Sequence, residues 1–297
     1  MKIPRAHWNA TIPPMPLPQD YTAQTNTAPQ SALVEARNLT KEYPRDGGVS
    51  RVVEDVSFAI LPGETLGLVG ESGSGKSTVA RMLLGLIEPT AGEVLFESGP
   101  LPAASSARMR AIRRRMQIVF QDPYAALNPR MTIAQILAEP YAIHRQPPPE
   151  GLPARLRDLL GSVGLDESAL PRYPHEFSGG QRQRINIARA LALNPRFLVL
   201  DEPVSALDVS VGAQVINLLR DLQRKLGLTY LFISHSMPLV RYLCDRVAVM
   251  QRGRLVELGD CLQVCQAPSN AYTRQLIAAT PEMPVANSPP RRSTATI

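Results

Sequence analysis

Cysteine is scarce in this sequence of 297 residues, which contains only Cys244, Cys261 and Cys265. An odd number of cysteines in a chain of this length argues against a disulfide framework. Cys261 and Cys265 lie four residues apart, which is a spacing seen among metal ligands. Without further Cys or His residues nearby this spacing is weak support for a metal or cluster site, and buried or idle thiols are the favoured interpretation.

Long apolar stretches are absent as well. No run approaches the roughly 20 consecutive apolar residues that a membrane-spanning helix needs. The first residues also lack the apolar region of a secretory signal. We therefore expect a cytoplasmic chain, which would reach a membrane only by docking on another protein at its cytoplasmic face.

Concentrated positive charge is missing too, although the formal net charge is +6. Beyond the short run Arg113-Arg114-Arg115 and the pair Arg291-Arg292, the basic residues are scattered along the chain. A nucleic-acid groove gathers Lys and Arg on one face or stripe. A solvated, arginine-rich surface is therefore favoured, and we expect no nucleic-acid partner.

The order of apolar patterns predicts an α/β fold with a mainly parallel, doubly wound sheet. Alternating strands at 33–39 and 51–60 come first. Continuous apolar strands at 65–69, 116–120, 197–200 and 229–233 then alternate with helices, among them those expected at 105–114 and from 209 to about 226. Residues 1–30 and 281–297 are expected to be disordered tails around one domain at 31–280. Prolines interrupt a mostly helical insertion at about 122–190, which we expect to pack beside the core.

A glycine-rich stretch follows the strand at 65–69 and precedes a helix, and it runs Gly70, Glu71, Ser72, Gly73, Ser74, Gly75, Lys76, Ser77, Thr78. Strand, glycine-rich loop and helix form the context that a phosphate-binding loop requires. Glycines let successive N–H groups point at one phosphate, and the following helix adds its positive end. Lys76 would reach the β- and γ-phosphates, while the Ser77 hydroxyl would ligate Mg²⁺.

A second helix start suited to an anion occurs at Ser178, Gly179, Gly180 and Gln181. Serine is a favoured N-cap residue, and the glycines beside it leave helix N–H groups open.

An acidic pair, Asp201 and Glu202, ends the apolar strand at 197–200. Alone, such a pair is usually a surface loop. Combined with an upstream phosphate loop in the same sheet, it predicts a nucleotide-hydrolysing site. Asp201 would hold Mg²⁺ directly or through water, and Glu202 would orient or deprotonate a water that attacks the γ-phosphate.

Three further residues are candidates for the same site. His235 follows a buried strand and could contact the γ-phosphate and Glu202, although a lone histidine is more often structural. Gln121, at the end of another strand, could offer a neutral oxygen to Mg²⁺ or to the attacking water. Tyr43 could stack on a purine base or could pack locally, and its spacing does not decide between the two.

Together these motifs resemble the nucleotide-binding domain of ATP-binding cassette (ABC) proteins over roughly residues 32–280. The discriminating element is the Ser178–Gln181 signature, because other P-loop families lack it. The resemblance implies a P-loop NTPase core, an N-terminal antiparallel β subdomain, ATP hydrolysis, and a contribution of Asp208 to the ATP site. It also implies a head-to-tail homo- or heterodimer, in which each ATP is held by the phosphate loop of one subunit and by Ser178, Gly179 and Gly180 of the other.

Finer motifs are similar to those of the dipeptide, oligopeptide and nickel importer branch. They are Gln121-Asp122-Pro123-Tyr124, Leu127-Asn128-Pro129-Arg130-Met131 and Ala271-Tyr272-Thr273-Arg274 followed by Leu276. This branch implies two transmembrane permease subunits, served by an extracytoplasmic solute-binding protein, with the helical insertion receiving the permease. The sequence departs from the family at Ser236, where Asp is usual, and at Asn186, where Gly is frequent. Its cysteines do not match the family's iron–sulfur cluster, so we expect none.

Two other functions remain open at this point. Soluble ABC proteins that act on nucleic acid or ribosomes typically carry two cassettes or a long coiled coil, and neither is present. An ABC-like subunit of a soluble complex, such as one for phosphonate breakdown, stays as the alternative to a peptide importer ATPase.

Overall fold

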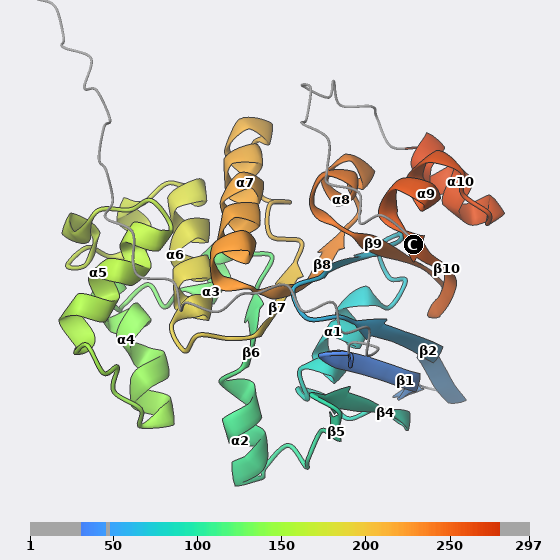
Figure 1. The fold of residues 1–297 in the computed structure, drawn as a ribbon, viewed down its shortest axis with the longest axis horizontal. Helices are drawn as coiled ribbons and strands as arrows, with labels where there is room; N and C mark the ends of the chain where they lie inside the picture. Colours follow the sequence, from blue (N-terminus) through green and yellow to red (C-terminus); the bar gives the residue numbers. More distant parts are fainter. Residues whose placement is uncertain (1–30, 46–47, 280–297) are drawn as a thin grey trace, which may run out of the picture. The chain divides into compact units, whose positions relative to one another are not determined.

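The computed structural model describes residues 31–45 and 48–279, so the two expected tails lie outside the described residues. The described residues form an α/β domain with two sheets. Figure 1 shows the smaller sheet beside α1 (Lys76–Leu83) and the larger one among the remaining helices. No helix within residues 31–45 and 48–279 is long and apolar enough to cross a membrane.

The smaller sheet is antiparallel, as expected for the N-terminal subdomain. Its strands are β2 (Gly48–Ile60), β1 (Val34–Arg45), β4 (Ala91–Phe96) and β5 (Gly99–Pro100), in that spatial order. The sequence pattern placed the end of the first strand near Thr40, and this is wrong, because β1 continues to Arg45. Register shifts between Ala36 and Glu42 interrupt the alternation, while pairing with β2 continues to the end of the strand.

The larger sheet is mainly parallel, which confirms the expected core. Its spatial order is β10 (Arg254–Asp260), β9 (Arg246–Gln251), β3 (Thr65–Val69), β8 (Thr229–Ser234), β7 (Phe197–Asp201) and β6 (Met116–Val119). Only β10 at its edge pairs antiparallel. Since ligands of open parallel sheets bind outside the carboxyl ends of the strands, the loops after β3, β6, β7 and β8 are the natural place for a site.

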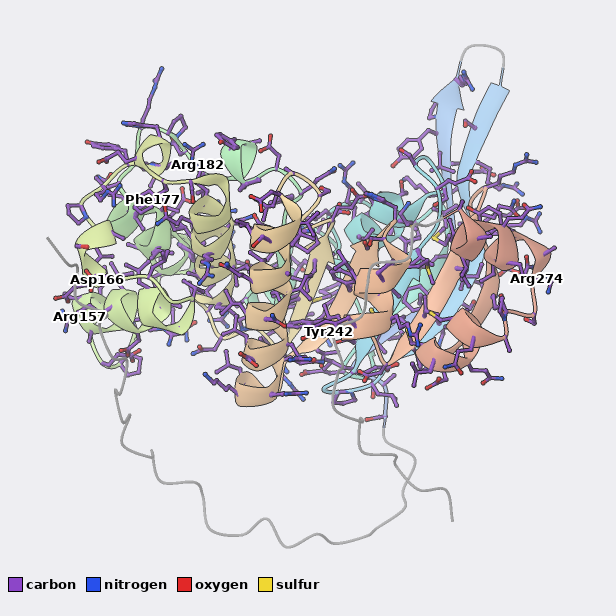
Figure 2. The ribbon with its side chains drawn as sticks, turned by 90° about the horizontal axis from the view of Figure 1, so that it is seen from above. Arg157, Asp166, Phe177, Arg182, Tyr242 and Arg274 are labelled. Carbon is purple, nitrogen blue, oxygen red and sulfur yellow. The ribbon has the colours of Figure 1, made fainter. Side chains whose placement is uncertain are left out.

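The insertion after β6 is mostly helical. It contains α3 (Pro123–Ala126), α4 (Ile133–His144), α5 (Leu152–Ser162), the 3-10 turns η1 (Glu167–Ala169) and η2 (Pro174–Glu176), and α6 (Gly179–Leu191). In Figure 2 the labelled Arg157 and Asp166 of this insertion lie at the opposite end of the domain from Arg274. The apolar side chains of the insertion belong to the same hydrophobic core as those under α7 (Val209–Leu226). The insertion is therefore packed onto the sheet.

Three short helices follow other strands. They are α2 (Ala107–Arg113), α8 (Met237–Leu243) and α9 (Cys261–Gln266), of which the sequence pattern predicted only α2. Pro238 lies in the first turn of α8, where its missing N–H costs nothing, so the proline begins a helix there. A final helix, α10 (Ala271–Ala278), is packed against β10. None of the three cysteines, all of which lie within the described residues, forms a disulfide, and Cys244 and Cys261 are buried.

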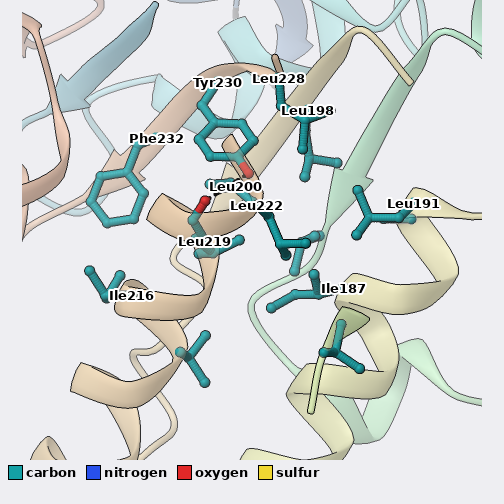
Figure 3. Close-up of a cluster of buried hydrophobic side chains, with 14 of the residues drawn as sticks. Ile187, Leu191, Leu198, Leu200, Ile216, Leu219, Leu222, Leu228, Tyr230 and Phe232 are labelled. Atoms are coloured by element: carbon teal, nitrogen blue, oxygen red, sulfur yellow. Dashed lines mark hydrogen bonds between the residues drawn. The ribbon is translucent and has the colours of Figure 1, made fainter. Parts of the chain in front are cut away.

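The core beneath α6 and α7 explains the rigidity of the strand ends. Figure 3 shows Leu198, Leu200 and Phe232 from the sheet facing Ile187 of α6 and Ile216 of α7. Tyr230 is fully buried, and its hydroxyl donates to the carbonyl of Leu219 over 3.0 Å. Such a close-packed core fixes where β7 and β8 end, and therefore where the polar residues after them lie.

Candidate functional site

The loop from Gly70 to Gly75 turns tightly between β3 and α1. Gly75 has a φ of 103°, and a Cβ there would lie 2.8 Å from the carbonyl oxygen of Val52. A Cβ on Gly70 would lie only 2.1 Å from the carbonyl oxygen of Met250. Both positions therefore require glycine, because the loop is enclosed by backbone from β2 and β9.

Lys76 is buried at the start of α1. Its Nζ donates to the carbonyl oxygens of Gly70, over 2.8 Å, and Glu71, over 2.7 Å, so it spans the opening of the loop. Burial lowers the pKa of Lys76, while the carboxylates of Glu202 and Asp201 act in the opposite direction. The site therefore holds a cation close to two acidic groups.

Ser77 and Asp201 face each other across the sheet edge. The Ser77 hydroxyl lies 3.4 Å from Oδ1 of Asp201, which is the last residue of β7. Burial raises the pKa of Asp201, and the hydrogen bond from Ser77 offsets part of that effect. A half-desolvated carboxylate beside a hydroxyl is a pair of oxygen donors that a hard divalent cation would stabilise.

Glu202 is the centre of a polar cluster formed at the ends of three neighbouring strands. Gln121, after β6, donates from Nε2 to Glu202 Oε2 over 3.3 Å. Nδ1 of His235, after β8, lies 3.3 Å from Glu202 Oε1. Glu202 itself has a φ of 46°, a conformation uncommon for a residue with a side chain. The structure thus brings Gln121 and His235 onto Glu202, although they lie 81 and 33 positions from it in the sequence.

The second helix start is capped by its own residues. Ser178 Oγ accepts from the N–H of Gln181, and Gln181 Oε1 accepts from the N–H of Ser178. This reciprocal capping box fixes the direction of α6. Within the part of the chain that the structure describes, no hydrogen bond joins residues 178–181 to residues 70–78.

Two other candidates are not bonded to the phosphate loop. Asp208 caps α7 through a 2.9 Å bond from the N–H of Val211 to its Oδ1. Tyr43 is 38% exposed on β1, and the Lys41 ammonium lies 5.3 Å from its ring centre. The fold places both at element ends, and their contribution to an ATP site stays a prediction.

Several contacts that the sequence did not indicate connect α6 to the site. Gln183 is fully buried and donates to the carbonyl of Pro203, over 2.7 Å, directly after Glu202. The guanidinium of Arg182, labelled in Figure 2, lies 3.9 Å from the ring centre of Tyr124 in the segment after Gln121. The sequence shows the run Arg182-Gln183-Arg184 but not the partners of its side chains, because Tyr124 and Pro203 come from distant segments.

Tyr272 is another site residue without an assigned role at the sequence level. The N–H of Glu71 donates to the Tyr272 hydroxyl over 3.2 Å, although the two residues are 201 positions apart. The motif around Tyr272 indicated a family branch but not this contact.

The fold and site define a P-loop ATPase: a glycine-rich loop with a buried lysine, beside two carboxylates at the end of β7. The family model described as "ABC transporter" matches residues 53–205. The chain belongs to this family, as its motifs indicated, and it is an ABC ATPase that binds and hydrolyses ATP.

Named relatives and solved structures agree with this assignment. The oligopeptide transport ATP-binding protein OppF of Bacillus subtilis is 50% identical over 252 residues, covering 84% of this chain and 82% of OppF. The glutathione import ATP-binding protein GsiA of Shigella flexneri is 50% identical over 267 residues, covering 88% of this chain and 43% of GsiA. Among solved structures, the dimeric post-hydrolysis state of the ATP-binding cassette MJ0796 bound to ADP and Pi has a TM-score of 0.69 and 29% identity, covering 77% of this chain and 98% of MJ0796.

Replacing Gly180 tests how closely α6 must approach α7. A Cβ at Gly180 would lie 2.2 Å from Cγ1 of Val211 but 3.6 Å from its Cβ. We expect Gly180→Ala to lower the free energy of unfolding by about 1–3 kcal/mol through overpacking. Adding Val211→Ala should remove that clash, leaving only the cost of the lost valine methyl groups. Urea denaturation of the single and double variants measures the coupling.

A control helix glycine with open space is available for this experiment. A Cβ on Gly161 of α5 would meet nothing within 4 Å. Gly161→Ala should leave stability unchanged or raise it by up to about 1 kcal/mol. Equal effects of the two Gly→Ala changes would contradict the packing argument.

Proposed function

We propose that this chain is the ATP-hydrolysing subunit of an ABC importer that takes up peptides or related small solutes. The observation that carries this proposal is the Glu202 cluster beside the phosphate loop, in a chain about 50% identical to proteins named for oligopeptide transport and glutathione import. Those names favour an importer over a subunit of a soluble complex for phosphonate breakdown. This subunit would not itself bind the transported solute, because specificity for the solute would lie in the permeases and the binding protein.

The residues of the phosphate loop would bind and orient the ATP phosphates. Backbone N–H groups of the segment 72–78, which includes Ser72 and Thr78, would donate to the phosphates, and Lys76 would exchange its carbonyl partners for β- and γ-phosphate oxygens. Its ammonium is already desolvated, so less solvation is lost when the phosphates arrive. The binding free energy therefore depends on a loop whose geometry is set before ATP binds.

Mg²⁺ is supported by the chemistry of the donors present. The Ser77 hydroxyl, the Asp201 carboxylate and the Gln121 amide oxygen are hard oxygen ligands, and Mg²⁺ is typically bound by one or two carboxylates plus substrate phosphates. When bound, the cation would neutralise charge that develops on the phosphate oxygens. Asp201 would then be held ionised in spite of its burial.

Glu202 would act as the general base for the attacking water. Its two carboxylate oxygens are already oriented by Gln121 and His235, each at 3.3 Å. Gln121 keeps one oxygen directed towards the end of β6, and His235 would contact the γ-phosphate from the end of β8. A positioned carboxylate of this kind contributes typically about 10²- to 10⁴-fold to a proton-transfer step.

A second ATPase subunit would complete the site. Gly179 and Gly180 offer N–H groups at the start of α6 that are not bonded to the phosphate loop of their own chain. The solved cassette MJ0796 is dimeric. In the proposed dimer, this helix start and the segment at Asp208 contact the ATP that is held by the other subunit, so ATP draws the two subunits together.

The permease would dock in a groove between β6 and α4. The groove has a volume of about 170 Å³. Two of its lining residues are apolar and exposed: Ile143 at 64% and Phe120 at 43%. Phe120 immediately precedes Gln121, and Asn186 Nδ2 lies 3.5 Å from its carbonyl oxygen. A partner seated there would press directly on the segment that carries Gln121, and the chain would be peripheral at the cytoplasmic face of the membrane.

Ile143→Asp tests this assignment. For the experiment, the proposed transporter would be reconstituted from this subunit, a partner ATPase and two permeases, and a peptide-loaded binding protein would be added on the outer side. The aspartate would place an unpaired charge where an apolar anchor residue of the interface is expected. Permease co-purification and peptide uptake should therefore fall roughly tenfold or more. ATP hydrolysis by the isolated subunit should be unchanged, because Ile143 does not touch the Glu202 cluster.

The matched control is Leu226→Asp at the end of α7, where the leucine is also apolar and 56% exposed. This variant should assemble and transport normally. Finding the wild-type chain only in soluble complexes, with no permease, would contradict the importer assignment. Normal uptake by Ile143→Asp would remove the groove from the docking surface but leave the ATPase assignment intact.

A further inference from the structure

The C-terminal helix α10 contacts the phosphate loop directly. The hydroxyl of Tyr272 accepts the N–H of Glu71, the second residue of the loop, over 3.2 Å. Tyr272 is only 8% exposed and Glu71 is exposed, so the bond is partly buried. This contact joins the last described helix to the first turn of the nucleotide site.

The Glu71 backbone is held from both sides. Its N–H donates to Tyr272, and its carbonyl oxygen accepts from Lys76 Nζ over 2.7 Å and from the N–H of Ser74 over 3.2 Å. The carbonyl of Ser74 in turn accepts from the N–H of Gly253, in the turn between β9 and β10, over 3.0 Å. Because Lys76 must leave its carbonyl partners to reach a phosphate, the contacts from Tyr272 and Gly253 are the ones that can hold the loop while ATP binds.

Tyr272 is itself placed by a network anchored on β10. The Glu257 carboxylate accepts the N–H of Ser269 over 2.8 Å and the N–H of Asn270 over 3.2 Å. Asn270 is the N-cap of α10, and its Oδ1 accepts the N–H of Tyr272 over 2.8 Å. The position of the Tyr272 ring is therefore set by the sheet edge, so its hydroxyl is a rigid acceptor.

We propose that Tyr272 is a positioning residue for ATP binding: through Glu71 it keeps the phosphate loop in the conformation that presents its N–H groups to the phosphates. Glu257 supports this role by fixing the start of α10. The proposal deepens the ATP-binding role assigned above to the phosphate loop and rests on it. Tyr272 touches neither Glu202 nor His235, so it acts on ATP affinity rather than on the chemical step.

Tyr272→Phe in the full-length protein tests the proposal, because phenylalanine keeps the ring and removes only the acceptor. Losing one partly buried hydrogen bond of this kind should weaken ATP binding about threefold to tenfold and raise KM for ATP in proportion. The kcat at saturating ATP should stay within about twofold of wild type. Titration with ATP and steady-state hydrolysis measure the two quantities separately.

Tyr230→Phe is the matched control. It also removes a tyrosine hydroxyl bonded to the backbone, but this hydroxyl donates to the carbonyl of Leu219 in the core under α7 and does not contact the loop. It should lower the unfolding midpoint and leave ATP affinity unchanged. A second variant, Glu257→Gln, keeps the side-chain shape but weakens the anchoring of α10, so KM should rise less than in Tyr272→Phe.

The outcomes separate this inference from the assigned function. If Tyr272→Phe binds ATP as tightly as the wild-type protein does, the positioning role of Tyr272 is overturned and the assigned function is not affected. A fall in kcat at saturating ATP without a change in ATP affinity also overturns that role. Wild-type protein that binds no ATP overturns the assigned function and this inference with it.

Discussion

Glu202→Gln should stop ATP turnover while ATP binding persists. The substitution keeps the side-chain shape, and the new amide oxygen can still accept from Gln121, so the local structure should be preserved. The proton acceptor is lost, and the hydrolysis rate should fall by about 10²-fold or more. ATP affinity should stay close to wild type, because Lys76 and the loop N–H groups are unchanged. Hydrolysis assays and ATP titration check the two expectations independently.

The same variant should also accumulate as an ATP-bound dimer. If the helix start at Ser178 completes the site of the other subunit, ATP that is not hydrolysed will keep the two subunits together. Size-exclusion chromatography with and without Mg²⁺ and ATP measures this directly. The control is Glu88→Gln, an exposed glutamate outside the cluster, which should hydrolyse ATP normally and stay in the wild-type oligomeric state. Near-normal hydrolysis by Glu202→Gln would count against Glu202 as the base.

Lys76→Ala should abolish tight ATP binding. Within residues 31–45 and 48–279, Nζ of Lys76 is the one side-chain cation hydrogen-bonded to the carbonyls of Gly70 and Glu71, and its removal would leave phosphate oxygens without a desolvated positive partner. Truncating a buried charged partner typically costs about 2–5 kcal/mol, which is at least about thirtyfold in affinity. Equilibrium binding of ATP by the purified chain measures the loss.

Loss of Lys76 should also loosen the loop before ATP arrives, because the carbonyls of Gly70 and Glu71 lose a shared donor. The melting temperature without nucleotide should therefore fall slightly, whereas the stabilisation by saturating ATP should disappear. Lys225→Ala removes an exposed lysine from the last turn of α7 and should change neither quantity. Unchanged nucleotide affinity in Lys76→Ala would remove Lys76 from its assigned role.

The main elements of the core could be predicted from local patterns because each is specified by neighbouring residues. The strand Thr65–Val69 and the helix Val209–Leu226 occur within the expected bounds, since one is continuously apolar and the other is periodically apolar between an Asp N-cap and a Gly after its end. The strand β1 was cut short where bulges shift its register. The helices α8 and α9 were missed, because six or seven residues make fewer than two helical turns and so show hardly any periodicity.

Chain order and residue type were enough to indicate a phosphate loop, an acidic pair and a signature helix, since each motif lies within a few consecutive residues. Only the tertiary structure shows that Gln121 and His235 both contact Glu202. The same is true of the contacts of Gln183 and Arg182 with the segments beside α6. It is also true of the hydrogen bond between Tyr272 and Glu71. These contacts depend on the spatial order of the strands β6, β7, β8 and β3, and strand order is set by packing of the whole core rather than by any local pattern.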